Sequence, residues 1–328
     1  MPHSYPNTTI QDAVDAYLNR IKQARSENTH KTYSNAMQSF LATLENFNLS
    51  NSTPAHSLPE EAVAWFANDL KKYSPSTEHL YLTAVMGFYE FLASERLYEP
   101  NLPRARLILR QRMRRTGQRL PQFPREKIEI ILNYTNNIAL SSAPDSIEHL
   151  RDMRDRAFLL TLADTGLRVH EACALRRGDI DWNEGRAVII GKGDQQAVVR
   201  FSSRSLNAIR EYIQIRSKLD GSSGRPLGSL PVFARHDRGA GKKVKPITTT
   251  TGRNIVAQRV KESLGEEALG LITPHSFRHF FVTTVLRGSG GNLKLAQELA
   301  RHKNISVTQR YAHLSNDELD KGYFEIFG

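Results

Sequence analysis

The chain has 328 residues, and its 39% of hydrophobic residues and 24% of charged residues are typical of a globular protein. The length is sufficient for two domains, and no apolar run approaches the ~20 residues that cross a bilayer. Cys173 is the single cysteine, which excludes an intrachain disulfide and argues against a structural zinc site. The formal net charge of +11 favours a polyanionic partner, with nucleic acid ahead of a membrane surface.

Residues 1–103 are predicted to form a bundle of four amphipathic helices. The segments TTIQDAVDAYLNRIKQA and NTHKTYSNAMQSFLATLENF repeat apolar residues every three or four positions. PEEAVAWFANDLKKY opens with a proline and two acids, which favour a helix start. In SPSTEHLYLTAVMGFYEFLASERL the apolar face is predicted to run from Leu80 to Leu92. We expect the aromatic residues of these helices to form the core of the bundle rather than a platform for stacked bases.

The segment from 104 to 123, RARLILRQRMRRTGQRLPQF, is strongly basic and contains no acid. Prolines beside and within it interrupt regular structure, so it is predicted to link two domains. The segment is either a solvated linker whose charge is incidental or a tether that lies along DNA phosphates. The absence of acids favours the tether. The arginines predicted to contact DNA are Arg104, Arg106, Arg110, Arg112, Arg114 and Arg115.

Residues 124–328 combine helices with one predicted hairpin. EHLRDMRDRAFLLTLADTG is a helix that ends at Gly166, and LRVHEACALRRGDIDW is a second helix running into a turn. RAVIIGKGDQQAVVRFS has two β-rich arms around a glycine-containing turn. Further helices are predicted on both sides of a loop over 220–246. The fold class is therefore mainly α, a helical bundle followed by an α+β domain with a small sheet.

The stretch TPHSFRHFFVTTVL places polar residues at the start of an apolar helix. Thr273 and Pro274 suit an N-cap and a first helical position. His275 and Arg278 then lie one turn apart on one face, at a helix end that favours anions. Such a pair suits a phosphate, although taken alone a histidine satisfied in the core is the more common case. His279 is expected to be structural.

Several polar residues follow one another in a fixed order along the chain: Arg168, Glu171, Lys192, His275, Arg278, His302 and Tyr311. This set resembles the signature of the tyrosine recombinase (phage integrase) family, which runs Arg-x-x-Glu, a Lys in a β-turn, His-x-x-Arg, His or Trp, and then Tyr. The words TGLRVHE, HSFRH and SVTQRYAHL agree with the family's motifs. The resemblance is close over the second domain and extends to the first through its helical layout.

The sequence departs from the family's pattern at three places, one of which is HFFVT in place of the usual small and polar HSFAT. Arg301 stands in ARH, where the family has a small glycine before the histidine. Gln195 and Gln196 follow the hairpin turn, where basic residues are common. These glutamines leave the assignment of Lys192 open, with lysines of a later loop as the alternatives: Lys242, Lys243 and Lys245.

The resemblance implies a metal-independent DNA strand transferase that needs no cofactor. Tyr311 would become esterified to a 3′-phosphate, while Arg168 and Arg278 hold the phosphate oxygens. His275 would accept the tyrosine proton or position the ring, and Lys192 would protonate the departing 5′ oxygen. The two other residues of the set would have supporting roles, a donor to the phosphate for His302 and an orienting group for Glu171.

The resemblance further implies a site-specific recombinase that works through a Holliday junction. Its partners would be a duplex DNA site and three further copies of the chain, two protomers at each site. The C-terminal tail, 319–328, would dock on a neighbouring protomer or pack on its own domain. We expect a cytoplasmic enzyme of two domains, because the chain opens on the helical bundle without a leader peptide or an arm-binding domain. It would be Xer-like or of the transposon and integron type, and would act in chromosome dimer resolution or in integration and excision of a mobile element. The rivals are a type IB topoisomerase-like enzyme and an inactive DNA-binding regulator.

Overall fold

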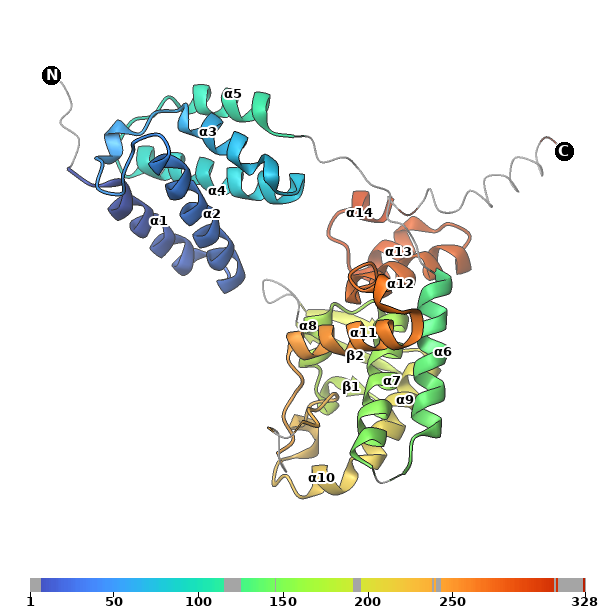
Figure 1. Cartoon of the computed structure of the whole chain (residues 1–328). Helices are drawn as coiled ribbons and strands as arrows, with labels where there is room; N and C mark the ends of the chain where they lie inside the picture. Colours follow the sequence, from blue (N-terminus) through green and yellow to red (C-terminus); the bar gives the residue numbers. More distant parts are fainter. Residues whose placement is uncertain are drawn as a thin grey trace. The chain divides into compact units, whose positions relative to one another are not determined.

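The computed structural model describes residues 7–114, 125–144, 146–190, 196–237, 239, 243–309, 311 and 327. The chain divides into two compact units, Met1–Gln118 and Arg119–Gly328 (Figure 1). Both units are mainly helical, and the second adds a sheet of three strands, which confirms the predicted fold class. Within the described ranges no helix is both long enough and apolar enough to cross a membrane.

The first unit is a helical bundle. Its helices are α1 (Ile10–Ala24), α2 (Glu27–Glu45), α3 (Ala62–Asp69), α4 (Pro75–Ser94) and α5 (Leu102–Arg112). The side chains of Thr9, Ser26 and Ser74 each accept a hydrogen bond from a first-turn amide, which explains where α1, α2 and α4 begin. Aromatic rings fill the core, as predicted. The prediction that Leu80 belongs to the apolar face of α4 is wrong, because this residue is 42% exposed.

Helix α5 corrects the predicted linker. The sequence predicts a connection from residue 104, but the chain is helical to Arg112, and Ala105 is fully buried where α5 packs on α3 and α4. The basic stretch contains no acid of its own, but carboxylates of other helices, distant in sequence, lie beside it. Three ion pairs result: Arg104 with Glu61, Arg106 with Glu90, and Arg114 with the fully buried Glu78.

The remaining arginines of the basic stretch differ from these three. Arg110 and Arg112 are exposed and form no ion pair with any carboxylate of the described ranges. Arg115 lies outside the described residues. Arg110 and Arg112 are therefore the members of the predicted DNA-binding set whose charge the described chain leaves unbalanced.

The second unit surrounds helix α7 (Ile147–Thr165), which packs against α6, α9 and α12. The other helices are α6 (Arg125–Ser141), α8 (Val169–Ala174), α9 (Ser203–Ile215), α10 (Ser217–Gly221), α11 (Thr249–Leu264), α12 (Pro274–Gly288), α13 (Leu293–Ala300) and α14 (Ile305–Gln309). Helices α12, α13 and α14 lie together at one end of this unit (Figure 1).

The predicted hairpin is confirmed. Strands β1 (Ile180–Asp181), β2 (Arg186–Ile190) and β3 (Gln196–Arg200) form an antiparallel sheet in the order β1-β2-β3. Ala187 pairs with Val199, and both side chains face the core. The turn between β2 and β3, residues 191–195, lies outside the described residues, and with it Lys192.

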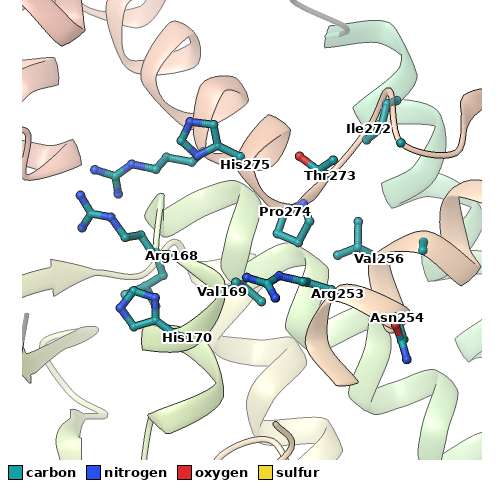
Figure 2. A pocket seen from close by; sticks show the side chains of 14 residues that line it. Arg168, Val169, His170, Arg253, Asn254, Val256, Ile272, Thr273, Pro274 and His275 are labelled. Carbon is teal, nitrogen blue, oxygen red and sulfur yellow. The ribbon is translucent and has the colours of Figure 1, made fainter. Parts of the chain in front are cut away.

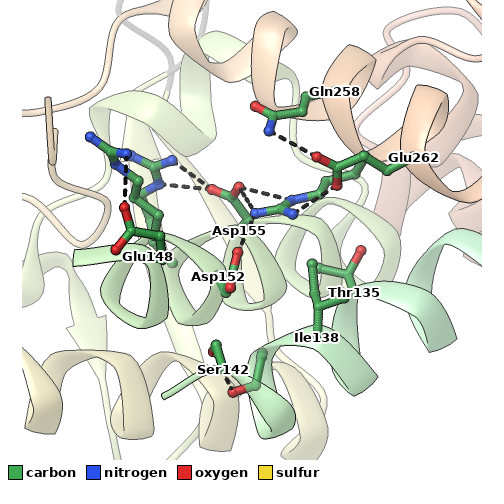
Figure 3. Close-up of polar contacts among 12 residues, drawn as sticks. Thr135, Ile138, Ser142, Glu148, Asp152, Asp155, Gln258 and Glu262 are labelled. Carbon is green, nitrogen blue, oxygen red and sulfur yellow. Dashed lines mark hydrogen bonds and ion pairs between the residues drawn. The ribbon is translucent and has the colours of Figure 1, made fainter. Parts of the chain in front are cut away.

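Buried ion pairs connect α7 to α11. Asp155, 2% exposed, accepts from Arg154 at 2.7 Å and from Arg259 of α11 at 2.7 Å. Arg259 also donates to Asp152 at 2.6 Å and to Glu262 at 2.8 Å, and Figure 3 shows the three carboxylates arranged around this contact. Ion pairs thus connect α11 to α7, in addition to the apolar core to which both helices contribute.

Candidate active site

The turn between α7 and α8 is built around Gly166. This residue has φ +60°, and a Cβ added there would lie 2.4 Å from a ring carbon of Phe281. A glycine is therefore required both for the left-handed backbone and for the close approach of α12. The predicted helix end is confirmed. Two residues later Arg168 precedes α8, with its side chain 45% exposed.

Glu171 anchors this turn from the inside of the protein. Its carboxylate accepts from the backbone N–H of Arg168 at 2.8 Å and from the Arg168 guanidinium at 3.0 Å. Burial by itself raises the pKa of Glu171. The Arg168 N–H and the charge of Arg301 outweigh this effect and hold that pKa below its usual range. Glu171 is therefore an anion that orients its neighbours.

Helix α12 begins as predicted, with Thr273 as N-cap and Pro274 in the first turn. His275 is exposed, whereas Arg278, one turn on, is 2% exposed. The Arg278 guanidinium donates to the backbone carbonyls of Gly166 and Ala300, so it holds α12 to the α7–α8 turn and to the end of α13.

The predicted phosphate-binding residues meet at one pocket. A cavity of about 490 Å³ is lined by Arg168, His275 and Arg278, together with Arg253 of α11. Figure 2 shows the Arg168 and His275 side chains extending from α8 and α12 to the same side of this pocket. Burial together with the charges of Arg168 and Arg301 lowers the pKa of Arg278 to about 10. Such a concentration of positive charge favours an anion in the pocket.

Tyr311 lies in the same site and is hydrogen-bonded to His279, which was expected from the sequence to be structural. Its hydroxyl forms a hydrogen bond with His279 Nδ1, and its ring is 4% exposed. Its anion would lie close enough to Arg278 to raise the pKa of that guanidinium. His275, predicted to accept the tyrosine proton or to position the ring, packs edge-on against His279 with ring centroids 4.4 Å apart.

A helical spacing could have indicated His279, because residues 275 and 279 are four apart on one helix and share a face. Burial, with His275 and Arg278 nearby, lowers the pKa of His279 to about 4. The imidazole is therefore neutral at neutral pH, and an unprotonated Nδ1 can accept the phenol proton.

His302 is a second histidine near the tyrosine. Its ring stacks on that of Tyr311 at 6.5 Å between centroids, and its Nδ1 is 2.9 Å from Thr308 Oγ1. Burial and the charges of Arg278 and Arg168 lower the pKa of His302 to about 4. Tyr311 belongs to a small apolar cluster with Val282 of α12 and Ala300 of α13.

Comparison with known proteins identifies the family. Residues 125–318 match the Phage integrase family over more than half of the chain. The chain belongs to this family and is a tyrosine recombinase. Tyrosine recombinase XerC of Pelobacter propionicus is 32% identical over 271 residues, 82% of this chain and 78% of the relative. XerC of Thermodesulfovibrio yellowstonii is 28% identical over 319 residues, 96% of each chain.

Solved structures of tyrosine recombinases share the fold. The Tn1549 transposon integrase in complex with transposon right end DNA has a TM-score of 0.66 at 19% identity, covering 98% of this chain and 100% of that chain. XerH bound to a palindromic difH substrate has a TM-score of 0.66 at 18% identity, covering 97% and 90%. The arrangement of helices around the small sheet is therefore that of the family.

Proposed function

We propose that the chain is a site-specific DNA recombinase in which Tyr311 attacks a DNA phosphodiester and forms a 3′-phosphotyrosyl link. The observation that carries the proposal is the hydrogen bond between the Tyr311 hydroxyl and His279, beside the pocket that Arg168 and Arg278 line. A nucleophile, a neutral base and paired guanidiniums in one site are the groups that phosphoryl transfer to a tyrosine requires.

In the cleavage step the Tyr311 oxygen forms a bond to phosphorus and the bond to the 5′ oxygen breaks. The phenol of Tyr311 passes its proton to His279, so His279 takes the role of proton acceptor, which was one of the two roles predicted for His275. Arg168 and Arg278 stabilise the charge that develops on the non-bridging oxygens, a role worth on the order of 3 kcal/mol for one preorganised donor.

The 5′ oxygen leaves with a proton from a cationic acid, a role proposed for Lys192. Rejoining reverses these steps, with the 5′ hydroxyl of the other strand as nucleophile and Tyr311 as leaving group. The phosphodiester energy is kept in the tyrosyl ester, so no nucleotide is consumed. His302, stacked on the Tyr311 ring, donates to the phosphate, and Glu171 orients Arg168.

Strand exchange between two DNA sites requires more than one active site. We propose that two protomers bind each site and four form the synapse, with strands exchanged through a Holliday junction. Support comes from the solved relatives, whose described complexes include a lambda integrase dimer bound to a core site. The predicted docking of tail 319–328 on a neighbouring protomer stays a prediction, because only Phe327 of that segment is described.

Covalent trapping tests the nucleophile. The chain first selects duplexes from a random-sequence pool, and the recovered duplexes are then nicked so that cleavage cannot be reversed. We expect a denaturant-resistant protein–DNA band with the wild-type chain and none with Tyr311→Phe. Equal bands from both proteins would contradict the assignment, and their absence from the wild type would contradict the activity.

A further inference from the structure

Arg301 occupies a backbone conformation that does not suit it. It follows α13 with φ +57° and ψ +45°, in the left-handed region. A side chain with a Cβ is strained there, which is why glycine is preferred at such helix ends and agrees with the small glycine of the family motif. This chain therefore keeps the glycine-like backbone while carrying a long cationic side chain.

The Arg301 guanidinium is also imperfectly satisfied. Its side chain is 11% exposed, and its buried Nη1 has no hydrogen-bond partner within the described structure. A buried donor without an acceptor is destabilising. Two unfavourable features at one residue indicate that the position is retained for function rather than for stability.

The other donor connects Arg301 to both phosphate-binding arginines. Arg301 Nη2 donates to Glu171 Oε2 at 3.1 Å, while Glu171 Oε1 accepts from Arg168 at 3.0 Å. The same Nη2 lies 3.4 Å from the Gly166 carbonyl, which also accepts from Arg278. Arg168 and Arg278, the two arginines assigned to the phosphate, thus each share an acceptor with Arg301.

Arg168 and Arg301, the two arginines that pair with Glu171, differ in exposure, and this difference indicates different roles. Glu171 is 3% exposed, Arg301 is 11% exposed, and Arg168 is 45% exposed at the mouth of the pocket. If Arg168 were the only cation on this buried carboxylate, its departure to a phosphate would leave the anion unpaired, which is costly. With Arg301 in place, the carboxylate remains neutralised from inside the protein.

We infer that Arg301 is a positioning residue of strand cleavage, which neutralises Glu171 and holds the Gly166 carbonyl so that Arg168 can turn onto the scissile phosphate. The inference rests on the proposed function. Arg301 acts through its neighbours and does not itself touch the phosphate. Its removal therefore slows cleavage while relieving strain in the folded protein.

Single variants of the full chain give the first test, with the nicked duplexes that the wild-type chain selects as the probe. We expect Arg301→Gln to form the covalent complex about tenfold more slowly at saturating protein, a typical coupling between contacting residues. Arg301→Lys, which keeps the charge, should recover most of that loss. Arg301→Gly should melt no lower than the wild type, because glycine suits the backbone.

A double-mutant cycle separates this role from simple structural support. In a Glu171→Gln background there is no carboxylate to neutralise, so adding Arg301→Gln should change the cleavage rate by less than about twofold. The same tenfold loss in both backgrounds would overturn the inference. Wild-type rates for Arg301→Gln would overturn it alone, whereas a wild-type chain without Tyr311-dependent covalent complex would overturn the proposed function as well.

Discussion

At the residue scale, the groups around Tyr311 form one electrostatic unit. Desolvation within the site, to which even the exposed His275 is partly subject, and the neighbouring guanidiniums lower the pKa of His275. Burial and neighbouring charges lower the pKa of His279 and of His302 to about 4. The guanidiniums thus have two effects, attracting a phosphate and keeping the imidazoles neutral. A neutral imidazole beside a phenol is ready to accept its proton.

His279→Gln tests the proton acceptor. Gln keeps a polar side chain but cannot take a proton, so we expect covalent-complex formation to slow by roughly 100-fold, the lower range of general-base contributions. His275→Gln, which leaves the bond between His279 and Tyr311 intact, is the matched control and should lose less. A larger loss in His275→Gln would indicate that His275, as one of its two predicted roles has it, accepts the proton.

The same histidines predict how stability depends on pH. A histidine with a lowered pKa is neutral in the folded chain at pH values where the unfolded chain, with an ordinary pKa near 6.5, binds a proton. Protons therefore favour the unfolded state, and stability is lost as the pH falls from about 6.5 toward the folded values near 4.

We accordingly expect the melting temperature of the chain to be lower at pH 5 than at pH 7.5. His302→Gln, which removes one of these groups, should narrow the difference between the two temperatures. Differential scanning calorimetry in buffers of equal ionic strength measures it. A melting temperature that rises on acidification would show that the lowered pKa values are wrong.

At the scale of secondary-structure elements, helix α7 connects the core to the active site. Its C-terminal end supplies the Gly166 carbonyl that binds Arg278, while its middle carries Asp155, which pairs with Arg259 of α11 (Figure 3). The position of α11, which lines the pocket through Arg253, thus depends on a buried ion cluster.

Asp155→Asn should destabilise the second unit strongly. It would leave the guanidiniums of Arg154 and Arg259 buried without their shared anion, and breaking such a pair typically costs about 3–5 kcal/mol. Urea unfolding followed by Trp182 fluorescence, in a Trp65→Phe background, reports on this unit. These are the two tryptophans of the chain, and they lie in different units.

The control for that experiment is Glu298→Gln, which breaks a pair between Lys294 and Glu298 with side chains 70% and 63% exposed. An exposed pair on one helix contributes at most about 0.5 kcal/mol. If Asp155→Asn changed the free energy of unfolding as little as this control, the buried cluster would have no structural role.

At the scale of the whole molecule, the two units have separate cores and the chain has a net charge of +11. The basic stretch that follows the first bundle is partly neutralised within its own unit, through the ion pairs of Arg104, Arg106 and Arg114. The charge left for a polyanion therefore includes Arg110 and Arg112, together with the pocket arginines.

The double variant Arg110→Gln, Arg112→Gln should weaken DNA binding and flatten its dependence on salt. Removing one cation that neutralises a phosphate reduces the slope of log K against log salt by about 0.9, so we expect a change near 2 for the pair. Fluorescence anisotropy of a duplex oligonucleotide at several KCl concentrations measures this slope. The matched variant Arg104→Gln, Arg106→Gln should change it little, and equal slopes for the two variants would contradict the assignment.

Sequence was sufficient for features that depend on neighbours along the chain. Thr273 and Pro274 start α12 and Gly166 ends α7 because caps and left-handed turns are set by local stereochemistry. The hairpin and the amphipathic helices follow from periodicity for the same reason. The order of the site residues indicated the family, since this chemistry requires those side chains.

Tertiary structure alone decided which distant groups meet. His279 and Tyr311 are 32 residues apart, and Arg301 and Glu171 are 130 apart. The acids that neutralise the basic stretch likewise come from other helices, so that stretch read as an open linker although its first part is α5. Hydrogen bonds and ion pairs act over a few ångströms in space and leave no periodic trace in the sequence, so folding alone brings these partners together.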